Sequence, residues 1–159
     1  MDWLLFAIVL GAAFGAGMTA VAFPTGPWYQ SLTKPGWTPP NWVFPVMWTG
    51  IYVLIAVAGA RVAGQPGSGY AMTFWAAQIA FNALWTPIFF GLRRLKGALP
   101  VMGALWLSVL GATIAHWQVD LWAGLAFAPY LIWVSIAGLL NWEMIRLNPN
   151  VQPLKTSDI

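Results

Sequence analysis

The residues able to carry acid, base or nucleophilic chemistry are few and widely separated along this chain of 159 residues. The carboxylates are Asp2, Asp120, Glu143 and Asp158, and the histidine is His116. None of the carboxylates has a histidine or serine at a spacing that suggests a catalytic pair. The chain has no cysteine, which excludes thiolate metal sites and cysteine nucleophiles. We therefore predict neither a metal site nor a conventional catalytic centre, and we interpret His116 as a residue of the membrane interface.

Two asparagines and several tryptophans are the residues whose chemistry stands out instead. Asn82 and Asn141 fall inside long apolar stretches, where an amide must find a hydrogen-bond partner. Each amide either ties helices together or faces a cavity that holds a polar group of a ligand, and we favour the cavity for at least one. Four tryptophans lie too deep in such stretches to be interfacial anchors. They are Trp48, Trp85, Trp106 and Trp133, and for any one of them core packing is an equal alternative.

These side chains are predicted to share one layer of the protein. At about 1.5 Å per helical residue, Trp48, Trp85, Trp106 and Asn141 lie roughly 8–12 Å from the same end of their helices. Tyr52 and Asn82 lie slightly deeper. A large apolar pocket with flat aromatic walls and a few polar groups suits a flat hydrophobic ligand such as a tetrapyrrole or a sterol.

Other polar and aromatic residues have local roles that the sequence explains. Asp120 directly precedes the last apolar stretch, where its carboxylate would accept from free amides at the helix start. Glu143 and Arg146 are predicted to form a local ion pair rather than a proton relay. The tryptophans near the ends of apolar stretches are interpreted as anchors at the membrane surface. They are Trp3, Trp75, Trp117, Trp122 and Trp142.

The elements that must position these residues are membrane-spanning helices. Hydrophobic residues make up 60% of the chain and charged residues 7%, against roughly 25% charged in soluble domains. The sequence predicts an all-α integral membrane bundle of five transmembrane helices, in one domain over residues 1–159. The first stretch lacks a basic n-region and stays apolar well beyond the length of a signal-peptide core, so we expect a retained span. The predicted helices are 3–23, 42–63, 70–92, 98–116 and 121–147, with a first loop at 24–41 and a polar tail at 148–159.

Two further patterns concern the loop and the helix contacts. The first loop is long and rich in proline, which favours a functional lid over a plain linker. A stripe of small residues on the third predicted helix is the candidate helix-helix seam, within one monomer or between the monomers of a homodimer. The stripe consists of Ala76, Ala80, Ala83 and Pro87.

The net charge of +3 reflects membrane topology and does not indicate a nucleic-acid partner. Arg61 is the basic residue of the end that holds the N-terminus and the second and fourth loops. The opposite end, with the first loop, the third loop and the C-terminus, holds Lys34, Arg93, Arg94, Lys96, Arg146 and Lys155. The positive-inside rule therefore places the first loop and the C-terminus on the cytoplasmic side of an inner membrane. In an outer membrane the same asymmetry fixes the relative arrangement of the two ends and not the compartment, and the sequence does not decide between the two membranes.

Several motifs together resemble the translocator protein family, whose members are also called tryptophan-rich sensory proteins and peripheral benzodiazepine receptors. The resemblance covers essentially the whole chain. In chain order the motifs are Pro35-Gly36-Trp37-Thr38-Pro39-Pro40, then Trp42, Phe44, Pro45 and Trp48, then Asn82-Ala83-Leu84-Trp85 with Phe89-Phe90, then Asp120, Pro129-Tyr130 and Trp133, and finally Leu140-Asn141 and Leu147-Asn148.

The resemblance implies a five-helix membrane bundle, usually a homodimer, whose pocket beneath the first loop binds porphyrins such as protoporphyrin IX and haem. The porphyrin is expected as a ligand, with no required cofactor. Eukaryotic relatives also bind cholesterol and synthetic isoquinoline or benzodiazepine drugs. The short chain without eukaryotic targeting features favours a bacterial member in the cell envelope. The predicted pocket residues are Trp37, Phe44, Trp48, Tyr52, Asn82, Trp85, Trp106, Trp133, Ala137, Leu140 and Asn141.

Three functions remain open at this point. The first is a porphyrin-binding sensor that regulates tetrapyrrole-linked responses. The second is a transporter of tetrapyrroles or sterols, against which the sequence shows no pair of corresponding broken spans and no buried charge pathway. The third is light-dependent porphyrin breakdown, since two tryptophans linked to it in the family map onto Trp48 and Trp133. Leu139, Leu140 and Arg146 match the family's sterol motif, but Trp142 replaces its tyrosine, so weaker sterol binding is expected.

Overall fold

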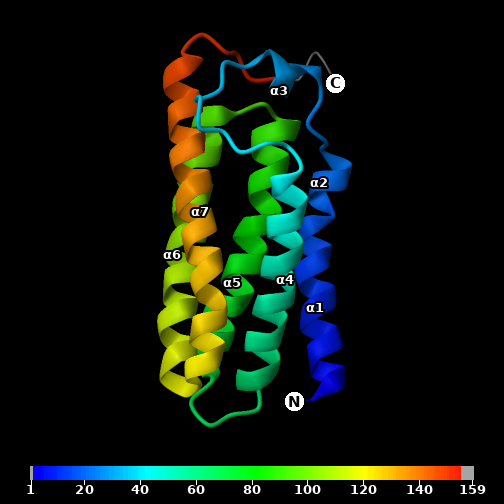
Figure 1. Ribbon diagram of the computed structural model, residues 1–159, viewed down its shortest axis with the longest axis vertical. Coiled ribbons are helices and arrows are strands. Elements are labelled where there is room, and N and C mark those ends of the chain that lie inside the picture. Colours follow the sequence, from blue (N-terminus) through cyan, green and yellow to red (C-terminus); the bar gives the residue numbers. More distant parts are fainter. Residues whose placement is uncertain (1, 155–159) are drawn as a thin grey trace.

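The protein is a bundle of long helices, seen here in a computed structural model that describes residues 2–154. Figure 1 shows the long helices side by side, with the start of α1 at one end of the bundle and the last described residues at the other. Every regular element in the described range is helical, which confirms the predicted all-α class. The elements are α1 (Trp3–Gly17), α2 (Thr19–Ala22), α3 (Pro27–Ser31), α4 (Val43–Val62), α5 (Gly69–Thr86), the π-helix η1 (Pro87–Gly91), α6 (Leu95–Val119) and α7 (Leu121–Leu147).

The long helices form a closed ring. Helix α1 packs on α4, α4 on α7, α7 on α6 and α6 on α5, and α5 returns to α1. The short helix α3 and the rest of the first loop lie across one end of this ring (Figure 1). We call this end the lid end, and the opposite end, with the turns after α4 and α6, the closed end.

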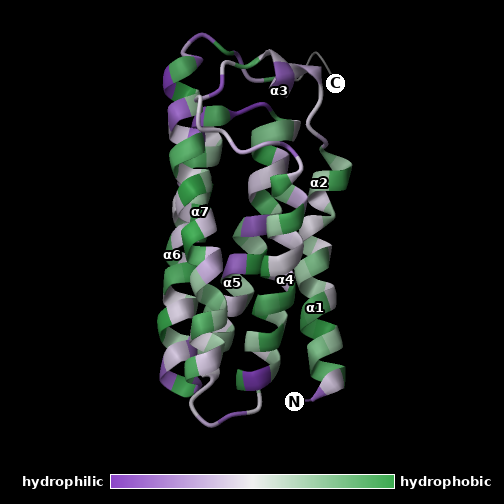
Figure 2. Cartoon of the chain, in the orientation of Figure 1, coloured by the Kyte–Doolittle hydropathy of each residue, from purple (hydrophilic) through white to green (hydrophobic). Residues whose placement is uncertain are grey.

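The helices consist mostly of apolar residues along their length, as the colours of Figure 2 show, and many large apolar side chains are exposed, Leu4, Leu107 and Ile132 among them. Four segments of the described chain are long and apolar enough to cross a membrane: Trp3–Ala22, Val43–Val62, Leu95–Val119 and Leu121–Leu147. Helix α5 is not one of them, and it carries the polar residues Gln78 and Asn82, whose side chains are buried. The chain is therefore a multi-pass membrane protein, and four of the five predicted spans meet this criterion.

Three predicted elements differ from the structure, two of them at a proline. The segment predicted as one helix at 70–92 divides into α5 and η1, because Pro87 has no amide hydrogen for the α-helical pattern. The chain widens there, and the Leu92 amide donates to the Pro87 carbonyl at 2.8 Å. The predicted helix 3–23 is interrupted at Met18, between α1 and α2. The predicted loop 24–41 contains α3, which begins at Pro27, a residue favoured at the first helical position.

The fourth predicted helix, 98–116, was too short at both ends. Helix α6 begins at Leu95 and ends at Val119. The predicted third loop, between residues 92 and 98, contains good helix formers, and Lys96 joins the first turn of α6. The turn is confined to residues 92–94, where Arg93 adopts a positive φ of 54°.

Local predictions about charged residues are confirmed. The Asp120 carboxylate accepts from the Ala123 amide at 3.0 Å at the start of α7, and it accepts from the Arg61 guanidinium at 2.7 Å. Glu143 and Arg146 pair at 2.8 Å. Both aspartates at helix starts act as caps, since Asp2 accepts from the second and third residues of α1.

Two interpretations of interface residues were wrong. His116 is fully buried, with its ring 4.6 Å from that of Phe127 and its Nδ1 2.8 Å from the Ala112 carbonyl oxygen. Trp75 is also buried, and its indole N–H donates to the Ile55 carbonyl at 2.8 Å. Both side chains point into the ring of helices. The position of a residue along the chain predicts its depth in the membrane but not the helix face on which its side chain lies.

The closed end is packed through glycines. Gly124 lies against the backbone of Trp117, so closely that an added Cβ would meet the Trp117 Cα at 2.6 Å. Gly111 lies against the Phe74 ring and Gly59 against the Trp75 indole. These contacts bring the helices close together at the closed end. The open space inside the bundle therefore lies at the lid end.

Candidate ligand-binding pocket

A cavity of about 530 Å³ lies inside the lid end of the bundle. Helices α1, α2, α4, α5, α6 and α7 all contribute to its wall, together with η1 and the start of the first loop. Its volume falls within the range of about 300–1,000 Å³ that is typical of small-molecule sites. The cavity therefore lies where the sequence predicts a pocket, beneath the first loop.

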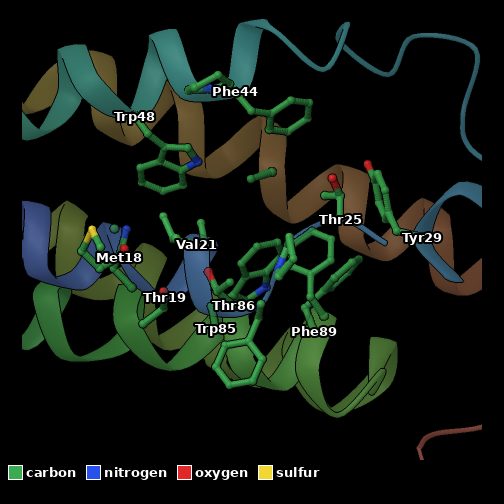
Figure 3. Close-up of a pocket in the computed structure, with 18 of the residues that line it drawn as sticks. Met18, Thr19, Val21, Thr25, Tyr29, Phe44, Trp48, Trp85, Thr86 and Phe89 are labelled. Carbon is green, nitrogen blue, oxygen red and sulfur yellow. The ribbon is translucent and has the colours of Figure 1, made fainter. Parts of the chain in front are cut away.

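Aromatic rings from different helices form the walls of the cavity. Figure 3 shows Trp48 of α4 and Trp85 of α5 on opposite sides of the open space. Trp85 stacks on Phe89 of η1, with ring centroids 4.8 Å apart. Trp48 packs on Tyr52 with its centroid 5.6 Å away. The two walls thus offer flat apolar faces, each held by a second aromatic ring.

The inner end of the cavity carries a chain of hydrogen bonds centred on Asn82. The Tyr52 hydroxyl donates to Asn82 Oδ1 at 3.2 Å, and Asn82 Nδ2 donates to the Tyr130 hydroxyl at 2.9 Å. This chain joins α4, α5 and α7 through buried side chains. In an apolar surrounding such bonds fix the side chains, because an unpaired polar group there is costly.

A second amide ties the helices nearer the lid. The Trp85 indole N–H donates to Asn141 Oδ1 at 3.4 Å, and Asn141 Nδ2 donates to the Leu95 carbonyl at 3.1 Å. Asn82 and Asn141 both line the cavity and both bond across helices. The two roles that the sequence left open are therefore combined in each amide.

The first loop covers the cavity. Tyr29 of α3 lines the cavity and packs on Phe90 of η1, with ring centroids 5.3 Å apart. Burial raises the pKa of the Tyr29 phenol above its usual value, so the phenol stays neutral at physiological pH. Lys34 lies next to it, with its ammonium 4.6 Å from the centre of the Tyr29 ring.

One side chain fastens this loop to the end of α7. Asn148 Oδ1 accepts from the Thr33 amide at 2.9 Å, and Asn148 Nδ2 donates to the Thr33 carbonyl at 2.8 Å. The same Nδ2 also donates to the Met144 carbonyl of α7. We call the pair Asn148–Thr33 the latch, since it holds both backbone groups of one loop residue.

The structure places most of the predicted pocket residues on the cavity wall. Those that line it are Phe44, Trp48, Tyr52, Asn82, Trp85, Ala137, Leu140 and Asn141. Three predicted residues lie elsewhere. Trp37 is 50% exposed on the first loop, Trp106 donates to Ser135 across the α6–α7 seam at 2.8 Å, and Trp133 is buried beside Phe44 with ring centroids 5.6 Å apart. None of these side chains lines the cavity, and depth along a helix does not predict the direction of a side chain.

Sequence reasoning missed the contribution of the first helix and of the π-helix. Phe14, Gly17 and Met18 lie three and four residues apart, which places them on one helix face, and this spacing could have revealed the wall. The other missed wall residues are Thr19, Ala20, Val21, Phe23, Pro24, Thr25, Tyr29, Asn41, Pro45, Thr49, Thr86, Phe89, Phe90, Met102, Leu105 and Met144.

The small-residue stripe of α5 faces outward in part. Ala76 and Ala80 are exposed, whereas Ala83 and Pro87 are half-buried. Ala76 and Ala80 therefore do not lie in a seam between helices of the monomer. A dimer through this stripe stays a prediction.

The described lining residues offer aromatic faces, hydroxyls and amides, and none of them carries a formal charge. In residues 2–154 no group of three or more His, Cys, Asp or Glu side chains is placed to hold a metal ion. Such a wall binds by shape, dispersion and a few directed hydrogen bonds. The geometry suits a flat, largely apolar molecule.

Comparison with known proteins adds independent information. A family model described as the TspO/MBR family matches residues 3–147. The protein CrtK of Rhodobacter capsulatus is 48% identical over 158 residues, which is 97% of this chain and 99% of the relative. A tryptophan-rich sensory protein of Cereibacter sphaeroides is 49% identical over 150 residues, covering 94% of this chain and 95% of the relative. The human translocator protein is 32% identical over 127 residues, covering 76% and 75%.

Proposed function

The chain belongs to the TspO/MBR family, and from this premise we propose that it is a membrane receptor for porphyrins such as protoporphyrin IX and haem. In this proposal the porphyrin binds in the cavity beneath the first loop, and its binding regulates tetrapyrrole-linked responses. The observation that carries the proposal is the aromatic cavity of about 530 Å³, lined by Asn82 at its inner end and by Asn141 nearer the lid. The names of the relatives, a tryptophan-rich sensory protein among them, agree with a sensory role.

The two facing walls support a flat ring as the ligand. A macrocycle between Trp48 and Trp85 would contact both indoles, and aromatic contacts of this kind favour planar ligands. Carboxylates of the porphyrin would avoid the uncharged interior and extend toward the lid. Lys34 lies there, beside Tyr29, and offers a cation for them.

We also propose that α5 and η1 together form a fifth membrane span. Residues 69–91 are enough for about 34 Å at 1.5 Å per residue, which matches the apolar thickness of a bilayer. The low hydropathy of this segment has a structural reason, since Gln78 and Asn82 are buried inside the ring and do not face lipid. The basic residues then place the lid end on the cytoplasmic side, and α5 offers its outward alanines to a homodimer.

The test is a titration of the purified protein in detergent with protoporphyrin IX, followed by the Soret absorbance of the bound porphyrin. We expect saturable binding, and a loss of affinity of about tenfold or more when Trp48→Ala is combined with Asn82→Ala. Trp37→Phe is the matched control, because Trp37 is an exposed loop tryptophan outside the cavity. Unchanged affinity in the double variant would remove the cavity from the proposal.

Light-dependent breakdown of the bound porphyrin is the second candidate function. Trp48 lines the cavity directly. Trp133 does not line it but packs on Phe44, which does. This function predicts several turnovers per protein under illumination and loss of product in Trp133→Phe. A reaction that stops after one equivalent would refute it. Porphyrin flux into liposomes that contain the protein would favour a transporter instead.

A further inference from the structure

A second cavity, of about 400 Å³, lies at the lid end and is separate from the aromatic cavity. Its wall is formed by the turn between η1 and α6, by the end of α7 and by the chain that follows α7. Arg93, Arg94 and Lys96 contribute three cationic side chains to this wall. No residue lines both cavities. We call this second cavity the basic cavity.

The cations of the basic cavity have no carboxylate partner in the part of the chain that the structure describes. The ion pairs of residues 2–154 are Arg61 with Asp120 and Glu143 with Arg146. Arg93, Arg94 and Lys96 belong to neither, and all three are exposed. Like charges this close repel one another, so an anion between them would be favourable. The cluster is therefore arranged to receive a negative group.

Backbone contacts hold the cavity in shape. The Arg94 amide donates to the Ile88 carbonyl at 3.1 Å, and Arg93 takes up its positive φ of 54° in the same turn. On the opposite wall, the Leu154 amide donates to the Leu92 carbonyl at 3.1 Å, which fastens the chain after α7 to this turn. The cations thus line a cavity with two fixed walls and are not scattered over an open surface.

The start of α6 adds to the attraction for an anion. This helix of 25 residues begins at Leu95 without a side-chain cap, and Leu95, Lys96 and Gly97 line the basic cavity. The uncapped amides of a long helix carry a partial positive charge. This contribution is secondary to the cavity and to its three cations.

The geometry points to the phosphate group of an anionic membrane phospholipid as the ligand of the basic cavity. The cavity lies at the polar edge of a membrane protein, where such headgroups are found. Leu92 and Leu147, which directly precede the lining residues Arg93 and Asn148 in the chain, are 40% and 41% exposed. A lipid whose phosphate occupies the basic cavity can therefore place its acyl chains along the apolar surface of the bundle, which a free anion cannot do.

The test compares lipids on the purified protein in detergent by native mass spectrometry and by the thermal unfolding midpoint. The probes are a phosphatidylglycerol, a phosphatidylcholine of the same chains, glycerophosphoglycerol without chains, and inorganic phosphate. We expect one tightly retained phosphatidylglycerol, a raised unfolding midpoint with this lipid, and no effect of the other probes. Retention should weaken as ionic strength rises.

The decisive variant is Arg94→Gln combined with Lys96→Gln, which keeps most of each side chain and removes two charges from the basic cavity. We expect about a tenfold loss of phosphatidylglycerol affinity, with an unchanged unfolding midpoint in phosphatidylcholine. The matched control is Lys34→Gln combined with Arg146→Gln, which removes two charges from the same end but outside the cavity. Equal losses in both variants, or equal retention of phosphatidylcholine, would overturn the proposal. Stabilisation by inorganic phosphate alone would replace the lipid with a free anion.

Discussion

The two ends of the bundle use the same kinds of residue to opposite effect. At the closed end, Gly124 meets the backbone of the neighbouring helix, and the helices touch. At the lid end, Gly17 and Gly91 meet the rings of Tyr52 and Phe23 instead, and the helices stay apart around the cavity. Gly111 and Gly59 at the closed end also face aromatic rings, so the contact of Gly124 with the Trp117 backbone is what distinguishes this end from the lid end.

From this difference we infer that the closed end contributes most to stability and that the lid end provides the binding site. Contacts between backbones cannot adjust, so an added methyl group at the closed end must move a whole helix. Rings at the lid end can rotate, so a methyl group there changes the cavity more than the fold. Four substitutions test this division, from the largest expected effect to the smallest.

Gly124→Ala should destabilise the fold without changing the cavity. An alanine Cβ would lie 2.6 Å from the Trp117 Cα, so α6 and α7 must separate. We expect the free energy of unfolding to fall by about 1–3 kcal/mol, measured by denaturation in mixed micelles. Gly103→Ala on α6 is the control, because nothing lies within 4 Å of its added Cβ. A Gly124→Ala protein as stable as the wild type would contradict the tight seam.

Gly17→Ala should weaken porphyrin binding and lower the free energy of unfolding by less than Gly124→Ala does. Its Cβ would lie 2.5 Å from the Tyr52 ring, which must then rotate and release Asn82. We expect about a tenfold loss of affinity in the Soret titration, or roughly 1.4 kcal/mol. Gly11→Ala, on the same helix with open space around it, should bind as the wild type does. If Gly17→Ala lowers the unfolding free energy by as much as Gly124→Ala, the two ends do not differ.

Asn148→Ala should loosen the lid while the rest of the bundle stays intact. The substitution removes two hydrogen bonds to Thr33, which together are worth about 1–2 kcal/mol. Hydrogen exchange at the Thr33 amide should accelerate, and the amides of α6 should exchange as before. Gln30→Ala changes an exposed side chain of the same lid and serves as the control. Unaltered exchange at Thr33 would mean that other contacts hold the lid.

Arg61→Gln should give the smallest effect, at the closed end, and the effect should depend on pH. The Arg61 guanidinium holds the pKa of the Asp120 carboxyl below its usual value. A lowered folded pKa stabilises the fold above the unfolded pKa, and this stabilisation is lost as the pH falls through the folded pKa. At neutral pH we expect a loss of about 0.2–1 kcal/mol, since the pair is partly exposed. Unfolding curves of the wild type and the variant should converge in acid, and a gap that stays constant would rule out this pair as the cause.

The sequence alone predicts the long helices and the layer of the cavity well. Apolar stretches of span length identified α4 and α7 to within one residue, because lipid demands long helices and proline and aspartate mark their ends. Eight of the predicted pocket residues line the cavity: helical rise predicted the depth of Trp48, Tyr52, Asn82, Trp85 and Asn141, and the family resemblance supplied Phe44, Ala137 and Leu140.

What the sequence does not predict is the direction in which a side chain points. The ring is apolar inside and outside, so the usual contrast between a polar and an apolar helix face is missing. Trp106 and Trp133 have the right depth but turn toward other helices, and Trp75 turns inward where an anchor was predicted. The π-helix was not predicted either, because Pro87 indicates that the α-helix is interrupted but not that a π-helix follows.

The two asparagines of α7 stand seven residues apart, and this spacing has a mechanical consequence. Seven residues are close to two helical turns, so Asn141 in the cavity and Asn148 of the latch lie along one line of the helix. A small rotation of α7 about its axis would displace both amides in the same direction. A ligand that displaces Asn141 would therefore also displace Thr33, and α7 would transmit the occupancy of the cavity to the surface of the lid end.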